Sequence, residues 1–134
     1  MKFIPLIGRL LFSTIFMYSS ISKFSDYFVY EAQSKGIPFS SLLIPLVGIF
    51  ELVAGLSILF GFMSKWGAWI VVILLLPITL VIHDFWNIED PVLYQLTMMT
   101  FMKNISILGG ALMISYFGSG PYSIDEAREN NGGN

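Results

Sequence analysis

The sequence predicts an all-α integral membrane protein, a four-helix bundle. Apolar residues make up 55% of its 134 residues and charged residues only 12%. A soluble domain typically carries about twice that charged share. Several apolar stretches are long enough to cross a bilayer, which takes about 20 helical residues. No stretch shows the period-two alternation that is typical of half-buried strands.

Four spans follow one another in a single membrane domain that covers residues 1–134. The expected spans are residues 3–21, 39–62, 66–82 and 96–117. Pro5 suits the first span because a helix tolerates proline in its first turn. Pro77 is expected to kink the third span. The fourth span is the least regular, because Lys103 and Asn104 interrupt its first third.

The first span also has the basic start and apolar run of a signal peptide. We expect a retained helix instead, because Arg9 interrupts the run and the stretch is long enough to span. Between the first two spans, apolar residues recur at helical spacing over 24–32, which predicts a short interfacial helix. The tail, residues 118–134, is polar and is expected to be mobile at its very end. An even number of spans places both termini on one side, and a small excess of basic residues there favours the cytoplasm.

Glu51 is the only charged residue between positions 35 and 65. A charge at this depth is costly, so it usually faces protein or a water-filled cavity. Gly48 and Gly55 share its helix face and let another helix approach closely. At 1.5 Å per residue, Arg9 lies about 9 Å and Glu51 roughly 16 Å from the same membrane face. We therefore expect an Arg9–Glu51 ion pair.

Other polar side chains are expected toward the opposite membrane face. They are Lys23, His83, Lys103 and Asn104. With Glu51 at its floor, this set predicts a polar pocket that opens to that face. Glu51 and His83 are the candidate catalytic residues, because each can exchange a proton within the membrane.

Each of these residues also has a purely structural interpretation. A buried pair at Glu51 can fix helix register without doing chemistry. His83 can cap the third helix, since a lone histidine seldom acts unaided. The lysines can extend to lipid headgroups, and Asn104 can bond between helices. The residues alone leave these alternatives open.

Composition excludes several classes of function. The chain has no cysteine and one histidine, which excludes disulfides, thiolate metal sites, cysteine nucleophiles and a bis-histidine haem. Its net charge of -2 and the lack of a basic tract argue against a nucleic-acid partner. No nucleophile elbow, phosphate loop or metal-ligand constellation is present, so we expect no metal site. Whether the protein is an enzyme stays open.

Several short motifs together resemble the DoxX family of small four-helix membrane proteins. They are GRLLF with Arg9, SKF with Lys23, GIP at 36–38, GIFELVAGLSILFG at 48–61, HDFW with His83, KNISILGGALM with Asn104, and GSGPYSID with Asp125. The resemblance covers nearly the whole chain. One departure is that serines stand where such proteins usually carry a glycine, just before the lysine that ends the first helix.

The resemblance implies a multi-pass protein of the bacterial inner membrane. It also implies an accessory or quinone-linked redox or stress component, with a quinone as the one cofactor and an oxidoreductase or other membrane complex as partner beside the lipids. The alternative is a non-catalytic scaffold, assembly factor or accessory subunit, whose polar residues only fix the bundle. The sequence has no redox-active group beyond tyrosine and tryptophan, so a quinone role needs a bound cofactor or a catalytic partner.

Overall fold

The computed structural model describes residues 1–132, and within them it contains helices and no strand. The long helices are α1 (Phe3–Ser22), α3 (Ser40–Phe60), α4 (Ser64–Val81) and α5 (Pro91–Phe117). The short ones are α2 (Asp26–Ser34), the 3-10 helix η1 (Phe85–Asn87) and α6 (Ile124–Gly132). Four candidate spans are long and apolar enough to cross a membrane, the third of them extending from α4 to Asn87. The predicted all-α fold with four membrane spans is therefore confirmed.

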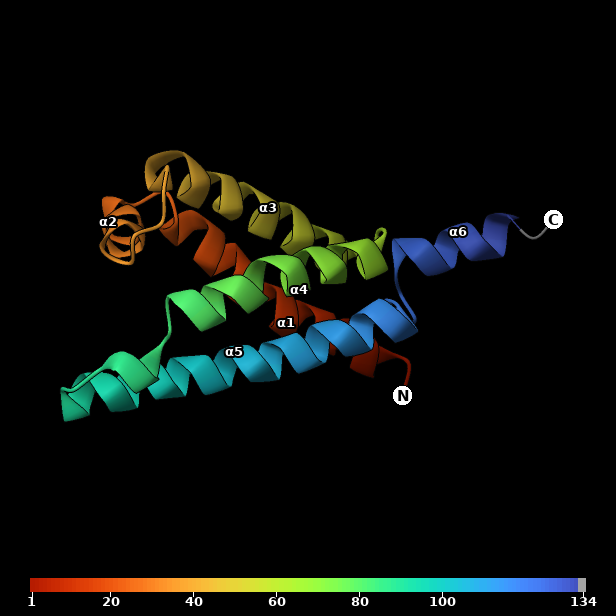
Figure 1. The fold of residues 1–134 in the computed structure, drawn as a ribbon. Coiled ribbons are helices and arrows are strands. Elements are labelled where there is room, and N and C mark those ends of the chain that lie inside the picture. Colours follow the sequence, from red (N-terminus) through yellow and green to blue (C-terminus); the bar gives the residue numbers. More distant parts are fainter. Residues whose placement is uncertain (133–134) are drawn as a thin grey trace.

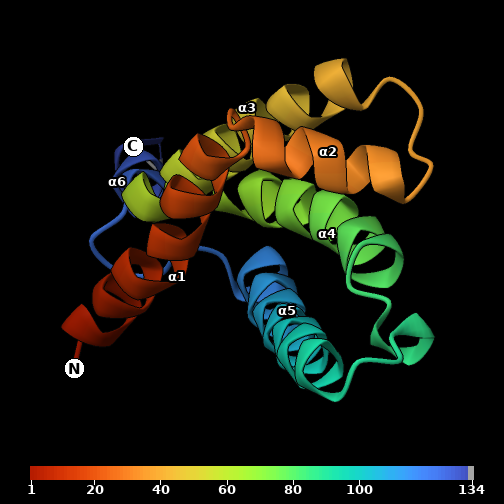
Figure 2. The ribbon, with the colours of Figure 1, turned by 90° about the vertical axis from the view of Figure 1, so that its left-hand side faces the viewer.

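The four long helices pack in chain order, α1 on α3, α3 on α4 and α4 on α5. Helices α1 and α5 are the two outer members of this series, and they diverge toward the end that carries α2 (Figures 1 and 2). Helix α2 packs on α3 at that end, and η1 packs on α5. The short α2 therefore occupies the predicted place between the first two spans. Helix α6 lies at the opposite end of the molecule (Figure 1).

The core is narrow because most apolar side chains face outward. Its buried residues are Phe16, Ala54, Ile58, Ala68, Val71, Leu75, Leu108 and Ala111. Outward residues such as Leu11, Leu42 and Ile73 are largely exposed on the isolated chain, as expected for side chains that face lipid. Small residues bring the helices together, in keeping with the packing of membrane helices.

Helix boundaries differ from the sequence expectation mainly at α5. It begins at Pro91, five residues before the expected 96, and continues through Lys103 and Asn104. Asp90 caps it, since its carboxylate accepts hydrogen bonds from the amides of Val92 and Leu93 at 3.0 and 2.8 Å. Proline suits the first helical position because no amide hydrogen is needed there. Lys103 and Asn104 thus interrupt the apolar pattern of the fourth span but not its helix.

The polar tail contains a further helix, α6. Helix α6 extends through residues 130–132, where the sequence suggested a mobile end. Residues 133–134 lie outside the described part of the chain. Prolines 45 and 77 both lie inside continuous helices, α3 and α4.

Replacement of Gly67 by alanine should weaken the contact between α3 and α4. An added Cβ would lie 2.6 Å from Ser57 Oγ, 2.8 Å from Ser57 Cβ and 3.1 Å from the backbone oxygen of Ala54. We expect Gly67→Ala to lower the free energy of unfolding by about 1–3 kcal/mol, the usual cost of overpacking. Denaturant unfolding in detergent micelles measures this change.

Gly109→Ala is the matched control for this prediction. A Cβ on Gly109 meets nothing within 4 Å, so the variant should keep or slightly raise stability. Equal loss of stability in the two variants would contradict the packing assigned to Gly67.

Candidate functional site

A cavity of about 240 Å³ lies among the four long helices, on the side of the molecule that carries α2, and α2 forms part of its wall. We call it the Glu51 pocket. Its apolar walls include Ile15, Phe16, Ile44, Leu75, Ile78 and Ile107. Its charged and strongly polar lining residues are Lys23, Glu31, Glu51, His83, Lys103 and Asn104. The structure thus brings together five of the six residues singled out from the sequence and leaves out Arg9.

Glu51 is paired with Lys23 from the end of α1. Lys23 Nζ donates to Glu51 Oε2 at 3.0 Å and to Ser19 Oγ at 2.8 Å, and only 10% and 5% of the two charged side chains are exposed. The Lys23 ammonium also lies 5.6 Å from the centre of the Phe28 ring, within cation–π range. The carboxylate therefore has a buried, hydrogen-bonded partner at membrane depth.

A glycine allows this approach of α1 to α3. A Cβ on Gly48 would lie 3.0 Å from the backbone oxygen of Ser20 and 3.1 Å from Lys23 Cβ. Gly55 lies one turn beyond Glu51, and a Cβ added there would likewise meet side-chain atoms of Phe16 and Met17 on α1. The glycines flanking Glu51 thus lie against α1, as their shared helix face indicated.

The expected Arg9–Glu51 pair is wrong. Arg9 Nη1 instead lies against Gly61, which follows Glu51 by ten residues or about 15 Å of helix. Long side chains on a helix lean toward its N-terminus. Lys23 therefore leans back along α1 toward Glu51, whereas Arg9 leans away from it, toward the end of α1 where the chain starts.

Arg9 belongs to a second polar group, which we call the Asp125 cluster: Arg9, Gly61, Met63, Ser64, Ser119, Pro121, Tyr122 and Asp125. Arg9 is buried, and its Nη2 donates to the carbonyl oxygens of Pro121 and Tyr122 at 3.1 and 2.7 Å. Within residues 1–132 its Nε and Nη1 have no hydrogen-bond acceptor. Arg9 thus fastens the C-terminal segment to α1.

Asp125 caps α4 from a distant part of the chain. Its carboxylate accepts hydrogen bonds from the amides of Met63 and Ser64 at 2.8 and 3.1 Å, and from the hydroxyls of Ser64 and Ser119 at 3.1 and 3.2 Å. Its own amide donates to the carbonyl oxygen of Gly61 at 2.8 Å. Burial acts to raise the pKa of Asp125, but these donors together outweigh it and hold the pKa below the ordinary 3.8.

Three further polar residues of the pocket are His83, Lys103 and Asn104. Asn104 is only 5% exposed as a whole residue and lines the pocket, and its amide is not among the buried polar groups left without a partner within residues 1–132. The half-buried His83 and the exposed Lys103 make no side-chain hydrogen bond or ion pair to the described residues. Because Asn104 lines the cavity, its amide can form hydrogen bonds with a bound group.

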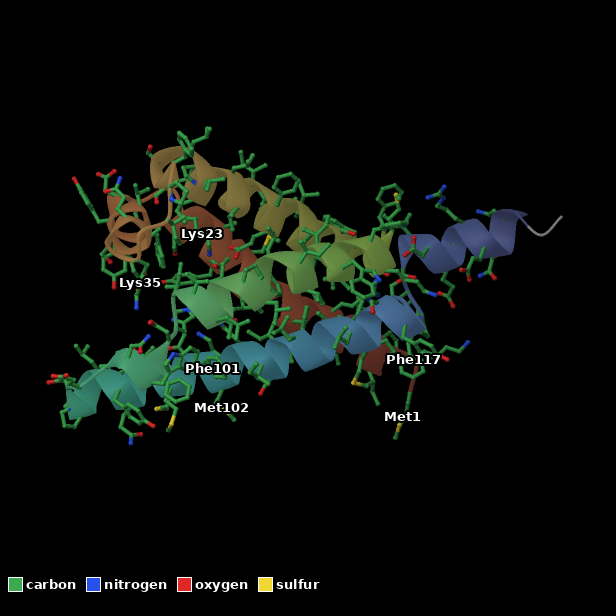
Figure 3. All side chains as sticks on the ribbon, viewed as in Figure 1. Met1, Lys23, Lys35, Phe101, Met102 and Phe117 are labelled. Atoms are coloured by element: carbon green, nitrogen blue, oxygen red, sulfur yellow. The ribbon has the colours of Figure 1, made fainter. Side chains whose placement is uncertain are left out.

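Two features of the pocket were missed from the sequence. Glu31 of α2 is half-buried at the pocket, and burial raises its pKa although Lys35 and Lys23 act to lower it. The sequence did carry a signal for Glu31: it follows Phe28 by three residues, and residues at that spacing share one face of a helix. The second feature is an ion pair between Lys35 and Asp84, which joins the end of α2 to the segment after α4. Figure 3 places Lys23 and Lys35 at this same end of the molecule.

No metal centre is evident in the described chain. Within residues 1–132, no three histidine, aspartate or glutamate side chains gather in a way that would hold a metal ion. The arrangement can bind a small polar group, donate hydrogen bonds to it and exchange protons with it.

Comparisons with known proteins agree with the fold. The family model described as DoxX matches residues 4–84. The "Inner membrane protein YqjF" of Escherichia coli (strain K12) is 30% identical over 120 residues, which cover 90% of this chain and 88% of that protein. The "Surfeit locus protein 4 homolog" of Schizosaccharomyces pombe is 26% identical over 98 residues, 72% of this chain but only 32% of that protein. No solved structure matches the chain.

Removal of Lys23 alone from the Lys23–Glu51 pair should lower the stability of the fold more than replacement of both residues. Lys23→Met leaves a buried carboxylate without a partner, and we expect it to lower the free energy of unfolding by about 3–5 kcal/mol. The double variant Lys23→Met/Glu51→Leu should recover most of that loss, because apolar replacements of a buried pair are often neutral. Unfolding in detergent gives the coupling energy, and additive losses would contradict a direct pair.

The cap provided by Asp125 should depend on pH. Because the pKa of Asp125 is lower in the folded protein, its carboxylate stabilises the fold above pH 4, and this contribution is lost as the pH falls through the folded pKa. Asp125→Asn should therefore cost about 1 kcal/mol near pH 7 and progressively less as the pH falls below 4. Melting temperatures across this range measure it, with exposed Glu129→Gln as control. A gap between Asp125→Asn and the parent that stays constant with pH would disprove it.

Proposed function

We propose that this chain, a member of the DoxX family, is a multi-pass inner-membrane protein that binds the headgroup of a quinone in the Glu51 pocket. It would serve as an accessory component of a redox or stress complex. The observation that carries the proposal is Asn104, a residue only 5% exposed that lines the pocket together with His83 and Lys103.

The pocket residues fit a quinone headgroup. The amide and the ammonium of Asn104 and Lys103 are donors, and a quinone ring presents carbonyl oxygens as acceptors. The walls are largely aliphatic, which suits a flat ring. At about 240 Å³ the cavity is smaller than the roughly 300–1,000 Å³ of drug-sized sites, so it suits a headgroup better than a whole lipid.

The pocket residues would have separate roles. Asn104 and Lys103 orient the headgroup by donating to its oxygens. His83 and Glu51 exchange protons with it, and Lys23 holds Glu51 in place. The quinone would supply the redox chemistry, and a partner subunit would supply or take up the electrons.

The cellular location rests on the relatives and on the charge pattern. The similar protein of Escherichia coli is named an inner membrane protein. Within residues 1–132, α1 starts and α6 ends at the same end of the molecule (Figure 1). This end would face the cytoplasm, where basic residues are enriched.

A scaffold role is the second candidate, and the ion pairs favour it. Lys23 and Glu51 satisfy one another, and Arg9 and Asp125 only join segments of the chain. In that role the bundle would hold a partner membrane protein, and the pocket would need no ligand. The two candidates differ in whether Asn104 contributes to binding of a small molecule.

Quinone binding to the purified protein in lipid nanodiscs tests the proposal. We expect the parent to bind a radiolabelled quinone and Asn104→Leu to bind it about tenfold more weakly, since one lost hydrogen bond to a buried group costs about 1.4 kcal/mol. Ser106→Ala, which changes an exposed residue two positions further along α5, is the matched control and should bind like the parent. Parent protein that binds no quinone, or a folded Asn104→Leu with full affinity, would favour the scaffold role.

A further inference from the structure

We infer that the ligand of the Glu51 pocket enters sideways from the bilayer, between α1 and α5, and that its hydrocarbon tail leaves by the same gap. The ligand class is therefore a lipid-soluble molecule with a small polar ring and a single chain. This inference rests on the proposed function, in which the pocket holds such a headgroup.

The two helices on either side of the gap scarcely touch. The pairs α1–α3, α3–α4 and α4–α5 are extensively packed, whereas α1 and α5 make few backbone contacts with each other. The helices approach closely at Gly110, where an added Cβ would lie 2.9 Å from Phe12 Cε2. From there toward α2 the helices diverge (Figures 1 and 2). The Glu51 pocket lies on the α2 side of this contact and is lined by residues of both α1 and α5.

The exposed lining residues mark the mouth of the pocket. Among all residues that line it, only Tyr18 and Lys103 are exposed, and Tyr18 is 72% exposed. Tyr18 belongs to α1 and Lys103 to α5, so the open side of the cavity lies between these two helices. Both residues lie in membrane-spanning helices, so this mouth faces lipid.

The water-facing side of the pocket is closed by charge pairs. Helix α2 lies over it, with the half-buried Phe28 and Glu31 in its wall, and Lys35 ties the end of α2 to Asp84. Beneath α2, the Lys23–Glu51 pair occupies the space between α1 and α3. A ligand that arrived from water would have to break these pairs, whereas one that arrived from lipid meets none of them.

The size of the cavity then dictates the shape of the ligand. About 240 Å³ accommodates a ring but no long chain, so a chain must remain in the gap. Apolar Ile15 and Ile107 line the pocket from α1 and α5 and suit a hydrocarbon chain. Lys103 at the mouth favours a head rich in acceptor oxygens, because its ammonium has no acceptor within residues 1–132.

Blocking variants test the route. Thr100 lines the pocket on α5, one turn from Asn104, and takes no part in the proposed binding. We expect Thr100→Trp to slow association of a long-chain quinone in nanodiscs at least tenfold. Met99→Trp places the same ring on an exposed, lipid-facing position that does not line the pocket and should leave the rate unchanged. Lys35→Ala, which opens the closure by α2, should also leave it unchanged.

The reverse pattern of quinone association rates in the two variants would overturn the inference. Unchanged association in Thr100→Trp together with faster association in Lys35→Ala would indicate entry from water. If the parent binds neither the long-chain quinone nor a tailless analogue, the proposed function fails instead, so the two failures are distinguishable.

A second measurement covers the case in which Thr100→Trp does not fold. The parent is incubated with a quinone that carries a photoreactive group at the end of its chain, and the cross-linked peptides are identified. We expect attachment to α1 near Tyr18 or to α5 near Thr100. Attachment to α2 would place the chain on the closed side and contradict the inference.

Discussion

The buried pair of Lys23 and Glu51 is the constraint on which the rest of the structure depends. A lone carboxylate in the middle of a membrane helix is costly, and it is tolerated only with a partner or with water. Lys23 supplies that partner at 3.0 Å, and Gly48 permits the two backbones to come close enough. This contact fixes the register of α1 against α3.

The same register produces two polar regions with different properties. At the end of the molecule where the chain starts, Arg9 and Asp125 bind backbone groups and join α1, the α3–α4 turn and the C-terminal segment. At the α2 end, Asn104 and Lys103 line the Glu51 pocket. The first region joins segments of the chain through hydrogen bonds to the backbone, whereas the second lines a largely apolar cavity, which favours a ligand there.

Much of this arrangement could be predicted from the sequence. The apolar stretches predicted four spans, and the glycines on the face of Glu51 predicted that α3 presents this face to another helix. The identity of the partner could not be read in the same way. The depths of the residues along the spans suggested Arg9 as the partner of Glu51. Long side chains on a helix point toward its N-terminus, however, so Lys23 reaches Glu51 and Arg9 points away from it. The cap on α4 could not be predicted either, because Asp125 lies 61 residues from Ser64 in the chain.

The most direct test of this account is a solid-state NMR measurement on the protein in bilayers, with ¹⁵N in the side chains of lysine and arginine and ¹³C in the carboxyl groups of glutamate. The account predicts strong dipolar coupling between Lys23 Nζ and the Glu51 carboxyl carbon, lost in Lys23→Met, and no coupling from Glu51 to the Arg9 guanidinium. Coupling of Glu51 to Arg9, or to neither residue, would contradict it.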